Sequence, residues 1–218
     1  MSRLGLTINH LMKLTFLAAI SFLMMAGSPS PVAAGAEATE AVQGTIAKVM
    51  GVLDDERLKG PEQVEERRHE VEEIIRQRVD YEEMAKRTLG TQWSSLSHHE
   101  QREFVDLFVQ LLRDTFAGRI SERSDEQVLY LGEQREDTFA EVKTQLKGRK
   151  IDTPVDFRLI QRSGDWRVYD VVIDGASIVS NYRSQFTSII RDVSYQGLVK
   201  KMRQKAVAVK VFEKNPAQ

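Results

Sequence analysis

The spacing of apolar side chains changes once along this 218-residue chain, and that change constrains the fold more than any other feature of the sequence. Before residue 127, apolar residues recur about every 3.6 positions, which is typical of amphipathic helices. After it they alternate with polar residues, as in strands. Connections as short as the turns at QRED, KGRK and RSGD join antiparallel neighbours, so the sequence predicts a meander. Its four predicted strands lie at about residues 127–134, 138–146, 151–162 and 165–173.

Alternation within the last two strands assigns the faces of the predicted sheet. One face is apolar, and the other holds Asp156, Arg158 and Asp170. A polar face is typical of an antiparallel sheet that helices cover on one side only. The phase of the alternation from Trp166 to Val168 is ambiguous. The residues that we assign to the apolar face are Val155, Phe157, Leu159, Tyr169, Val171 and Ile173.

Helical patterns precede the sheet. Residues 40–53 carry one apolar stripe, and residues 61–79 carry a second on a segment whose many charges indicate a solvated face. Asp80 with Glu83, and Ser97 with Glu100, have the spacing of helix N-caps and predict two more helices. The stripe positions of the first two helices are Val42, Ile46, Val49, Leu53, Val64, Val71, Ile74 and Ile75.

The most apolar helix, residues 98–117, is apolar over more than one face. A surface helix needs an apolar stripe only about 100° wide, so this helix is either sandwiched between layers or lines an interior space. After Gly175 the chain returns to helix, and a last amphipathic helix follows. Helices before and after a meander predict an α+β domain with helices on one face of a curved sheet. The return helix and the last helix carry Ile178, Tyr182, Phe186, Ile189, Val193, Leu198, Val199 and Met202.

The start of the chain, residues 1–36, reads as a cleaved signal peptide. Arg3 and Lys13 precede an apolar run that is shorter than the ~20 residues of a membrane-spanning helix. The small residues that follow provide cleavage sites after Ala34 or Ala36. We therefore expect an exported protein with one domain, residues 37–206, and a frayed C-terminal tail, residues 207–218.

Composition argues against two broad classes of function. Without the first 36 residues, the chain has 29 basic and 32 acidic residues, which gives a formal charge of −3. Nucleic-acid-binding domains normally show a basic excess, so general nucleic-acid binding is disfavoured. The chain contains no cysteine, which excludes disulfides and thiolate chemistry. Its stability must therefore come from packing.

The chemistry-bearing side chains form no convincing catalytic or metal site. His98 and His99 are adjacent, so they point about 100° apart on a helix and lack the i, i+4 spacing of a zinc-binding pair. The sequence contains no G-x-S-x-G nucleophile motif. Asp170 and Asp174 could form an acid–base pair, but a turn and a helix cap explain them better. We expect no catalytic residue and no metal.

Two blocks of sequence resemble one family. They are YEEMAKRTLGTQWSSLSHHEQREFVDLF and DWRVYDVVIDGASIVSNYRSQF, and the resemblance runs from about residue 70 to 205. It is to the periplasmic phospholipid-binding MlaC family, also described as toluene-tolerance auxiliary proteins. Ala176 departs from the bulkier residue that similar proteins often carry after the glycine. The matching residues are Met84, Ala85, Leu89, Gly90, Trp93, Gln101, Arg102 and Phe104, then Trp166, Val168, Tyr169, Asp170, Val171, Gly175, Ser177, Val179, Asn181, Tyr182, Arg183 and Phe186.

The resemblance implies a fold and a ligand. The fold is an NTF2-like cone, an antiparallel sheet of four or more strands with helices packed on one face around an apolar cavity. The cavity holds phospholipid acyl chains and leaves the head group outside, so the phospholipid is a ligand and no cofactor is needed. On this view the fourth strand and its return helix form two walls of the cavity, hinged at Asp174-Gly175. The implied lipid-binding residues are Phe104, Phe108, Leu111, Leu112, Val142, Phe157, Leu159, Tyr169, Val171, Ile173, Ala176, Val179, Tyr182 and Phe186.

The resemblance also implies a place and partners. Such proteins shuttle lipid through the periplasm between an outer-membrane lipoprotein complex and an inner-membrane ABC transporter with an MCE-domain subunit, which maintains outer-membrane lipid asymmetry. Three alternatives stay open at this stage: a carrier of hopanoid or another lipid, an enzyme on an NTF2-like cone, and a periplasmic adaptor with a solid core.

Overall fold

The computed structural model describes residues 36–120, 127–148 and 151–205, all within one compact unit, Gly35–Gln218. Apart from Ala36, the expected signal peptide lies outside the described residues, and so does the expected tail, residues 207–218. Within the described ranges, no helix combines the length and apolar character needed to span a bilayer.

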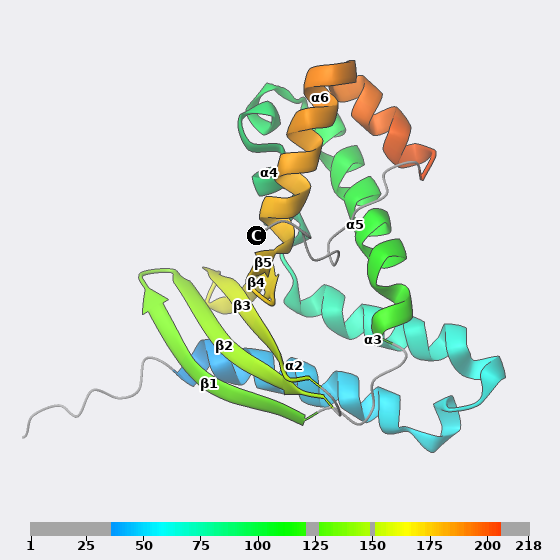
Figure 1. The fold of residues 1–218 in the computed structure, drawn as a ribbon, viewed down its shortest axis with the longest axis vertical. Coiled ribbons are helices and arrows are strands. Elements are labelled where there is room, and N and C mark those ends of the chain that lie inside the picture. The colour runs from blue at the N-terminus through cyan, green and yellow to red at the C-terminus, as the bar shows by residue number, and fades with distance from the viewer. Residues whose placement is uncertain (1–35, 121–126, 149–150, 206–218) are drawn as a thin grey trace, which may run out of the picture. The chain divides into compact units, whose positions relative to one another are not determined.

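The predicted meander is confirmed as an antiparallel sheet (Figure 1). A two-residue fifth strand, which the sequence analysis did not predict, follows the fourth through a turn at Asp174 and Gly175. Both turn residues have positive φ, 50° and 79°, the geometry of a two-residue hairpin turn. The strands, paired in chain order, are β1 (Gln127–Glu136), β2 (Phe139–Lys147), β3 (Thr153–Arg162), β4 (Asp165–Ile173) and β5 (Ala176–Ser177).

A β-bulge in β4 explains why the sequence left the phase around Trp166 ambiguous. Arg158 of β3 pairs with Asp170, but the next residue, Leu159, pairs with Val168, so Tyr169 has no partner. One extra residue reverses the alternation at that point. Val168 and Val171 therefore share a face although they lie three residues apart.

The five α-helices of the described residues follow the predicted order. Asp80 accepts a hydrogen bond from the Glu83 amide (2.9 Å), and Ser97 and Glu100 cap each other's backbone amides, so both predicted N-caps are confirmed. The last helix breaks at Ser194 (φ 69°, ψ 172°), between Val193 of the predicted return helix and Leu198 of the predicted last helix. The helices are α2 (Ala36–Asp54), α3 (Val64–Arg78), α4 (Tyr81–Leu89), α5 (His98–Ile120) and α6 (Ile178–Arg203), with 3-10 turns η1 (Glu56–Leu58), η2 (Pro61–Gln63) and η3 (Gly90–Ser95).

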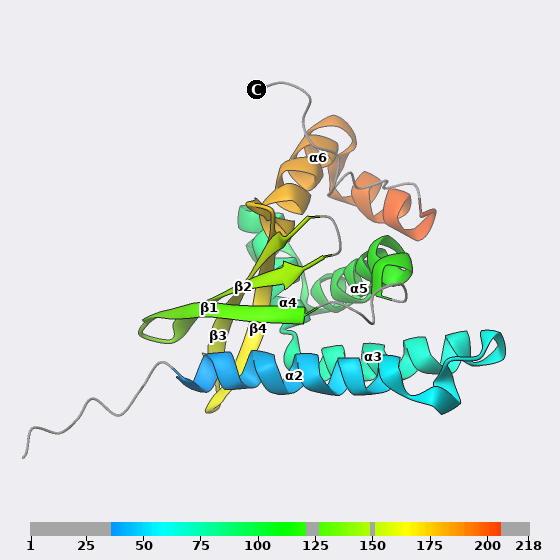
Figure 2. The same ribbon diagram turned by 60° about the horizontal axis from the view of Figure 1, so that its bottom comes forward.

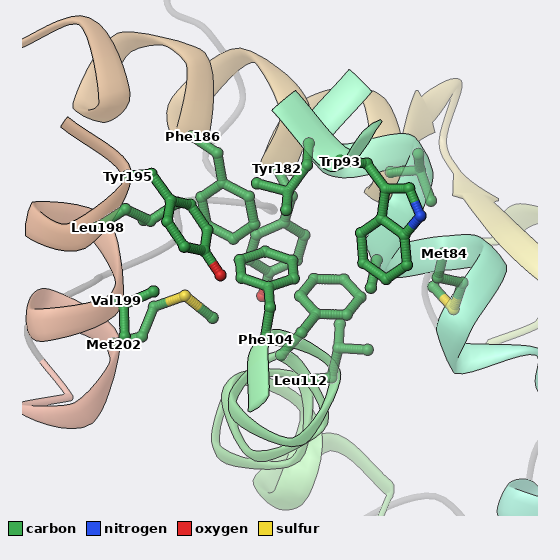
Figure 3. Close-up of a cluster of buried hydrophobic side chains, with 14 of the residues drawn as sticks. Met84, Trp93, Phe104, Leu112, Tyr182, Phe186, Tyr195, Leu198, Val199 and Met202 are labelled. Carbon is green, nitrogen blue, oxygen red and sulfur yellow. The ribbon is translucent and has the colours of Figure 1, made fainter. Parts of the chain in front are cut away.

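Two apolar clusters form the core. The helical cluster joins α4, η3, α5 and α6 around four interlocked aromatic rings, those of Phe104, Phe108, Tyr182 and Phe186 (Figure 3). The sheet cluster joins α2 to β2, β3 and β4, and α2 runs along the sheet in both ribbon views (Figures 1 and 2). Its buried members are Ala38, Val42, Ala140, Val142, Leu159, Trp166 and Val168.

The opposite face of the sheet is not bare, which corrects the prediction of cover on one side only. Ile160, Asp170 and Val172 of that face are buried, at 6%, 2% and 8% exposure. Tyr169, assigned by sequence to the apolar face, packs instead against Phe139 and beneath the Arg87 guanidinium, 4.1 Å from its ring centroid. The bulge places Tyr169 in these contacts, because it sets this residue out of phase with its neighbours.

The link between α3 and α4 lies against the sheet edge. Val79 forms an isolated parallel bridge with Val168, and the Asp80 amide donates to the Val168 carbonyl oxygen over 2.9 Å. The link therefore covers part of β4 that β5 does not reach.

Candidate functional site

A partly open cavity of about 450 Å³ lies between the sheet and the helices α2, α3 and α5. Its volume falls within the range of about 300–1,000 Å³ that is usual for small-molecule sites. Most of its wall is apolar. The apolar lining residues are Val42, Ile46, Val49, Met50, Leu53, Val71, Ile75, Val79, Tyr81, Met84, Val109, Leu112, Phe116, Val128, Leu146, Val155, Phe157, Val168, Val171, Ile173 and Ile178.

The sheet contributes one face of this wall. Thr144 of β2 pairs directly with Val155 of β3, and both residues line the cavity, so a cross-strand pair forms part of this face. Thr144 is buried, and its hydroxyl donates to the Val155 carbonyl oxygen. This hydrogen bond turns the polar atom of Thr144 toward the backbone, which leaves its methyl group for the apolar wall.

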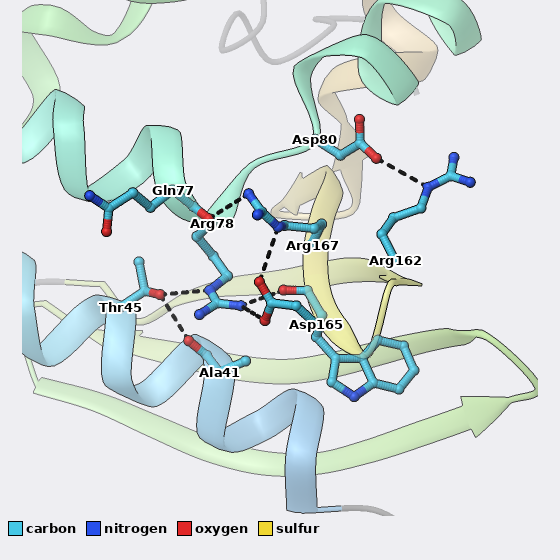
Figure 4. Close-up of polar contacts among 9 residues, drawn as sticks. Ala41, Thr45, Gln77, Arg78, Asp80, Arg162, Asp165 and Arg167 are labelled. Carbon is cyan, nitrogen blue, oxygen red and sulfur yellow. Dashed lines mark hydrogen bonds and ion pairs between the residues drawn. The ribbon is translucent and has the colours of Figure 1, made fainter.

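Arg78 fastens the two N-terminal helices to the sheet (Figure 4). Its guanidinium, at the end of α3, donates to Thr45 of α2 (3.1 Å) and to Asp165 of β4 (2.8 Å), and also to the Trp166 carbonyl oxygen. Arg167 adds a second bond from β4 to α3, to the Gln77 carbonyl oxygen (2.7 Å). These bonds hold α2 and α3 over the sheet and so define the cavity between them.

Asp170 fixes the start of α6. Its carboxylate, in a residue only 2% exposed, accepts from the Ser177 hydroxyl (2.6 Å) and the Val179 amide (3.0 Å), and pairs with Arg158 (3.2 Å). A carboxylate bound to amides at a helix N-terminus stabilises that terminus. Asp170 is thus committed to structure, and exposed Asp174 lies in the hairpin turn, so the two do not form an acid–base pair.

The fourteen residues that the resemblance implied for lipid binding lie in different parts of the structure. Leu112, Phe157, Val171 and Ile173 line the cavity. Phe104, Phe108, Val179, Tyr182 and Phe186 belong to the helical cluster, with Leu111 and Tyr169 packed against it. Val142 and Leu159 are fully buried in the sheet cluster, and Ala176 is exposed beside the turn. Of the return helix, which the resemblance implied as a wall, Ile178 of α6 is the one residue in the described cavity lining.

The wall that sequence reasoning missed comes from α2 and α3. Its signal was present, because the apolar stripes of both helices, from Val42 to Leu53 and at Val71 and Ile75, are the residues that face the cavity. The sequence analysis interpreted the charges of residues 61–79 as a solvated face. It gave the two apolar stripes no role beyond packing. Spacing alone cannot tell a stripe that packs from one that borders a space.

Charged side chains also reach the cavity. Its described lining includes five arginines, Arg67, Arg68, Arg76, Arg78 and Arg113, and one carboxylate, Glu72. Glu72 of α3 pairs with Arg113 of α5 over 3.0 Å. Burial raises the pKa of the Tyr81 phenol, which lines the cavity, and nearby Arg76 opposes that rise.

The described residues contain no group of three His, Cys, Asp or Glu side chains placed to hold a metal ion. Glu100, the acidic member of the His-His-Glu sequence, receives the Ser97 amide and hydroxyl in a capping box, both over 2.8 Å. These bonds give Glu100 a structural role at the start of α5.

Comparisons with known proteins agree on one family. A family model described as MlaC protein matches residues 43–204, which is more than half of the chain. The intermembrane phospholipid transport system binding protein MlaC of Haemophilus influenzae is 22% identical over 140 residues, 62% of this chain. That alignment spans 65% of the relative, slightly less than two thirds of its length.

A solved structure shares the fold. It is the phospholipid-binding protein of Ralstonia solanacearum in complex with a phospholipid, 23% identical to this chain, with a TM-score of 0.70. The match covers 78% of this chain and 96% of that one. At this identity the likeness shows the architecture, and the α+β class that the sequence predicted is confirmed.

Proposed function

The chain belongs to the MlaC family, and from that premise we propose that it is a phospholipid carrier whose cavity between the sheet and α2, α3 and α5 holds the acyl chains. The family match and the relative from Haemophilus influenzae place it among binding and transport proteins rather than enzymes. The observation that carries the proposal is the cavity itself, because a solid-core adaptor would need no apolar space of about 450 Å³.

The energetics of the cavity suit a carrier. Each methylene group of the acyl chains that the cavity hides from water contributes about 0.8 kcal/mol gross. A bilayer offers the same gain, so the net preference between cavity and membrane is a small difference. Lipid can then leave in either direction once a partner supplies an apolar path.

The proposed setting is the periplasm. A cleaved signal peptide, residues 1–36, would export the chain. There it would shuttle phospholipid between an outer-membrane lipoprotein complex and an inner-membrane ABC transporter with an MCE-domain subunit, and so maintain outer-membrane lipid asymmetry. The relative from Haemophilus influenzae, described as the binding protein of an intermembrane phospholipid transport system, supports this setting.

Mass spectrometry of a solvent extract tests the proposal. The protein, purified without detergent, should carry about one equivalent of phospholipid. An extract that contains a hopanoid in place of phospholipid would change the ligand class, and a lipid-free extract from protein that also takes up no lipid from vesicles would contradict the carrier role. Protein from the same preparation, unfolded and washed before extraction, measures adhering lipid.

A further inference from the structure

The opening of the cavity between α3 and α5 carries arginines. Their guanidinium groups have no polar partner in a hydrocarbon chain, so binding of the acyl chains does not account for them. Arg68, Arg76 and Arg113 line the cavity, and their side chains are 40%, 56% and 37% exposed, so they stand where it meets solvent. Arg68 and Arg76 lie eight residues apart on α3, which places them on one helix face with Glu72 between them. Arg113 reaches the same point from α5.

Glu72 shows how closely two of these guanidinium groups approach one anion. One of its oxygens lies 3.6 Å from Arg68 and the other lies 3.0 Å from Arg113. Arg68 and Arg76 also pair with Glu65 and Glu73, which are 73% and 51% exposed and do not line the cavity. Such exposed pairs are weak. At the described wall of the opening, the three arginines therefore accompany one carboxylate, which contacts two of them, Arg68 and Arg113.

The charged opening borders the apolar wall directly. Tyr81 lines the cavity, and its pKa, raised mainly by burial, responds to Arg76, Glu72 and Arg113, so its phenol lies within electrostatic reach of all three. Leu112, the residue before Arg113, belongs to the apolar wall. A ligand that fits this arrangement has an anionic group joined to a hydrocarbon body.

We propose that this opening is a phosphate site, in which Arg68 and Arg113, supported by Arg76, bind the phosphodiester of the lipid whose chains fill the cavity. This inference rests on the proposed function and adds a head-group requirement to it. Arginine matches phosphate through paired N–H donors, and a phosphodiester offers strong acceptors like those of the carboxylate. A bound phosphate replaces Glu72 as the partner of the two arginines.

A competition between two lipids with the same chains tests the site. Lipid-free protein is mixed with vesicles of dioleoylphosphatidylglycerol that contain dioleoylglycerol, and the bound ratio of the two lipids is compared with the vesicle ratio by mass spectrometry. The wild-type protein should enrich the phosphate-bearing lipid. The double variant Arg68→Gln, Arg113→Gln should bind the same total lipid with the enrichment reduced about tenfold, as expected when charge-assisted hydrogen bonds are lost.

Two further variants separate the site from general charge and from folding. Arg57→Gln with Arg191→Gln removes two positive charges from side chains that are 87% and 77% exposed and do not line the cavity, so the enrichment should stay at the wild-type level. Glu72→Gln removes the competing carboxylate and should increase the enrichment severalfold. If the Glu72–Arg113 pair only joined α3 to α5, its loss would not increase the enrichment, and that result would overturn the site.

Two results distinguish failure of the phosphate site from failure of the carrier function. An unchanged lipid ratio in the arginine double variant, with total lipid also unchanged, would overturn the phosphate site and leave the carrier role intact. A wild-type protein that takes up neither lipid would overturn both. Inorganic phosphate alone should bind the lipid-free protein far more weakly than the phospholipid does; binding as tight as that of the phospholipid would assign the arginines to free phosphate instead.

Discussion

Val171 is the single residue that best distinguishes a cavity wall from a packed core. It lines the cavity and also touches both apolar clusters. A charge placed against hydrocarbon costs several kcal/mol, so Val171→Glu should exclude the lipid, while water entering the emptied cavity solvates the carboxylate. We expect a folded variant by circular dichroism whose solvent extract contains little or no lipid.

Leu159→Glu is the matched control. Leu159 lies two residues along β3 from Phe157, which pairs with Val171, but it is fully buried in the sheet cluster and does not line the cavity. Its carboxylate has no water to reach, and domains are stable by only about 5–15 kcal/mol, so this variant should unfold. If Val171→Glu unfolds as well, or keeps a full complement of lipid, our placement of Val171 on a lipid-contacting wall is wrong.

Asp170 should be the most sensitive polar residue outside the cavity. Asp170→Asn keeps the shape of the side chain but turns an N–H group toward one of three donors, those of Ser177, Val179 and Arg158. Hydrogen bonds to a charged partner contribute about 2 kcal/mol each, so the free energy of unfolding in urea should fall by about that amount. Asp156→Asn, at a less buried carboxylate of β3, should change it by less than about 0.5 kcal/mol.

At the residue scale, the sequence predicted which residues cap helices better than it predicted where side chains lie in the fold. The capping residues Asp80, Ser97 and Glu100 were assigned correctly, because a cap depends on neighbours three residues away. Tyr169 was assigned to the wrong contacts, because the bulge that moves it depends on pairing with β3, which no local pattern shows. Ten of the fourteen implied lipid-binding residues lie elsewhere than on the cavity wall, since apolar character is shared by cores and cavities.

At the scale of elements, the kink in α6 is a site of backbone strain. Ser194 has φ 69° and ψ 172°, a region that glycine occupies readily and other residues do not. Its hydroxyl receives the Gly197 amide (3.4 Å) as a weak cap for the second half of the helix. Ser194→Gly should relieve the strain and lose only a few tenths of a kcal/mol of capping, so it should raise the free energy of unfolding by about 1 kcal/mol.

A glycine in the regular part of the same helix gives the opposite sign. Ser188→Gly, placed where the backbone is helical, should lower the free energy of unfolding by about 0.5 kcal/mol. Urea titrations of both variants check the pair. Equal destabilisation by the two substitutions would show that the backbone at Ser194 carries no strain.

Element type and order were predictable because the two periods, 3.6 and two, are long and clear in this chain. Which elements pack against one another was not predictable from these periods. The family resemblance implied that the return helix forms a wall of the cavity, whereas α6 packs mainly on α4 and α5, and the helical walls of the cavity come mainly from α2, α3 and α5. The Arg78 bonds to Thr45 and Asp165 decide that arrangement, and they link residues 33 and 87 positions apart.

At the scale of the whole molecule, the proposed export makes a direct prediction about where the mature chain begins. The small residues before position 37 suit a signal peptidase, so N-terminal sequencing of protein purified from the periplasm should begin at Gly35 or Glu37. Replacing Ala34 and Ala36 with bulky residues should block cleavage and leave a longer, membrane-associated form. Wild-type protein that keeps Met1 on membrane-bound material would contradict export by a cleaved signal peptide.

The bridge between Val79 and Val168 has a consequence for self-association. An open strand edge can accept a strand from another molecule, which is a common start of aggregation. Here β5 and the Val79 link block the edge at β4. The opposite edge, β1, shifts register between Tyr130 and Gly132 and then carries the exposed charged residues Arg135 and Glu136, which disfavour strand addition. Both edges of the sheet therefore disfavour strand pairing with a second copy of the chain.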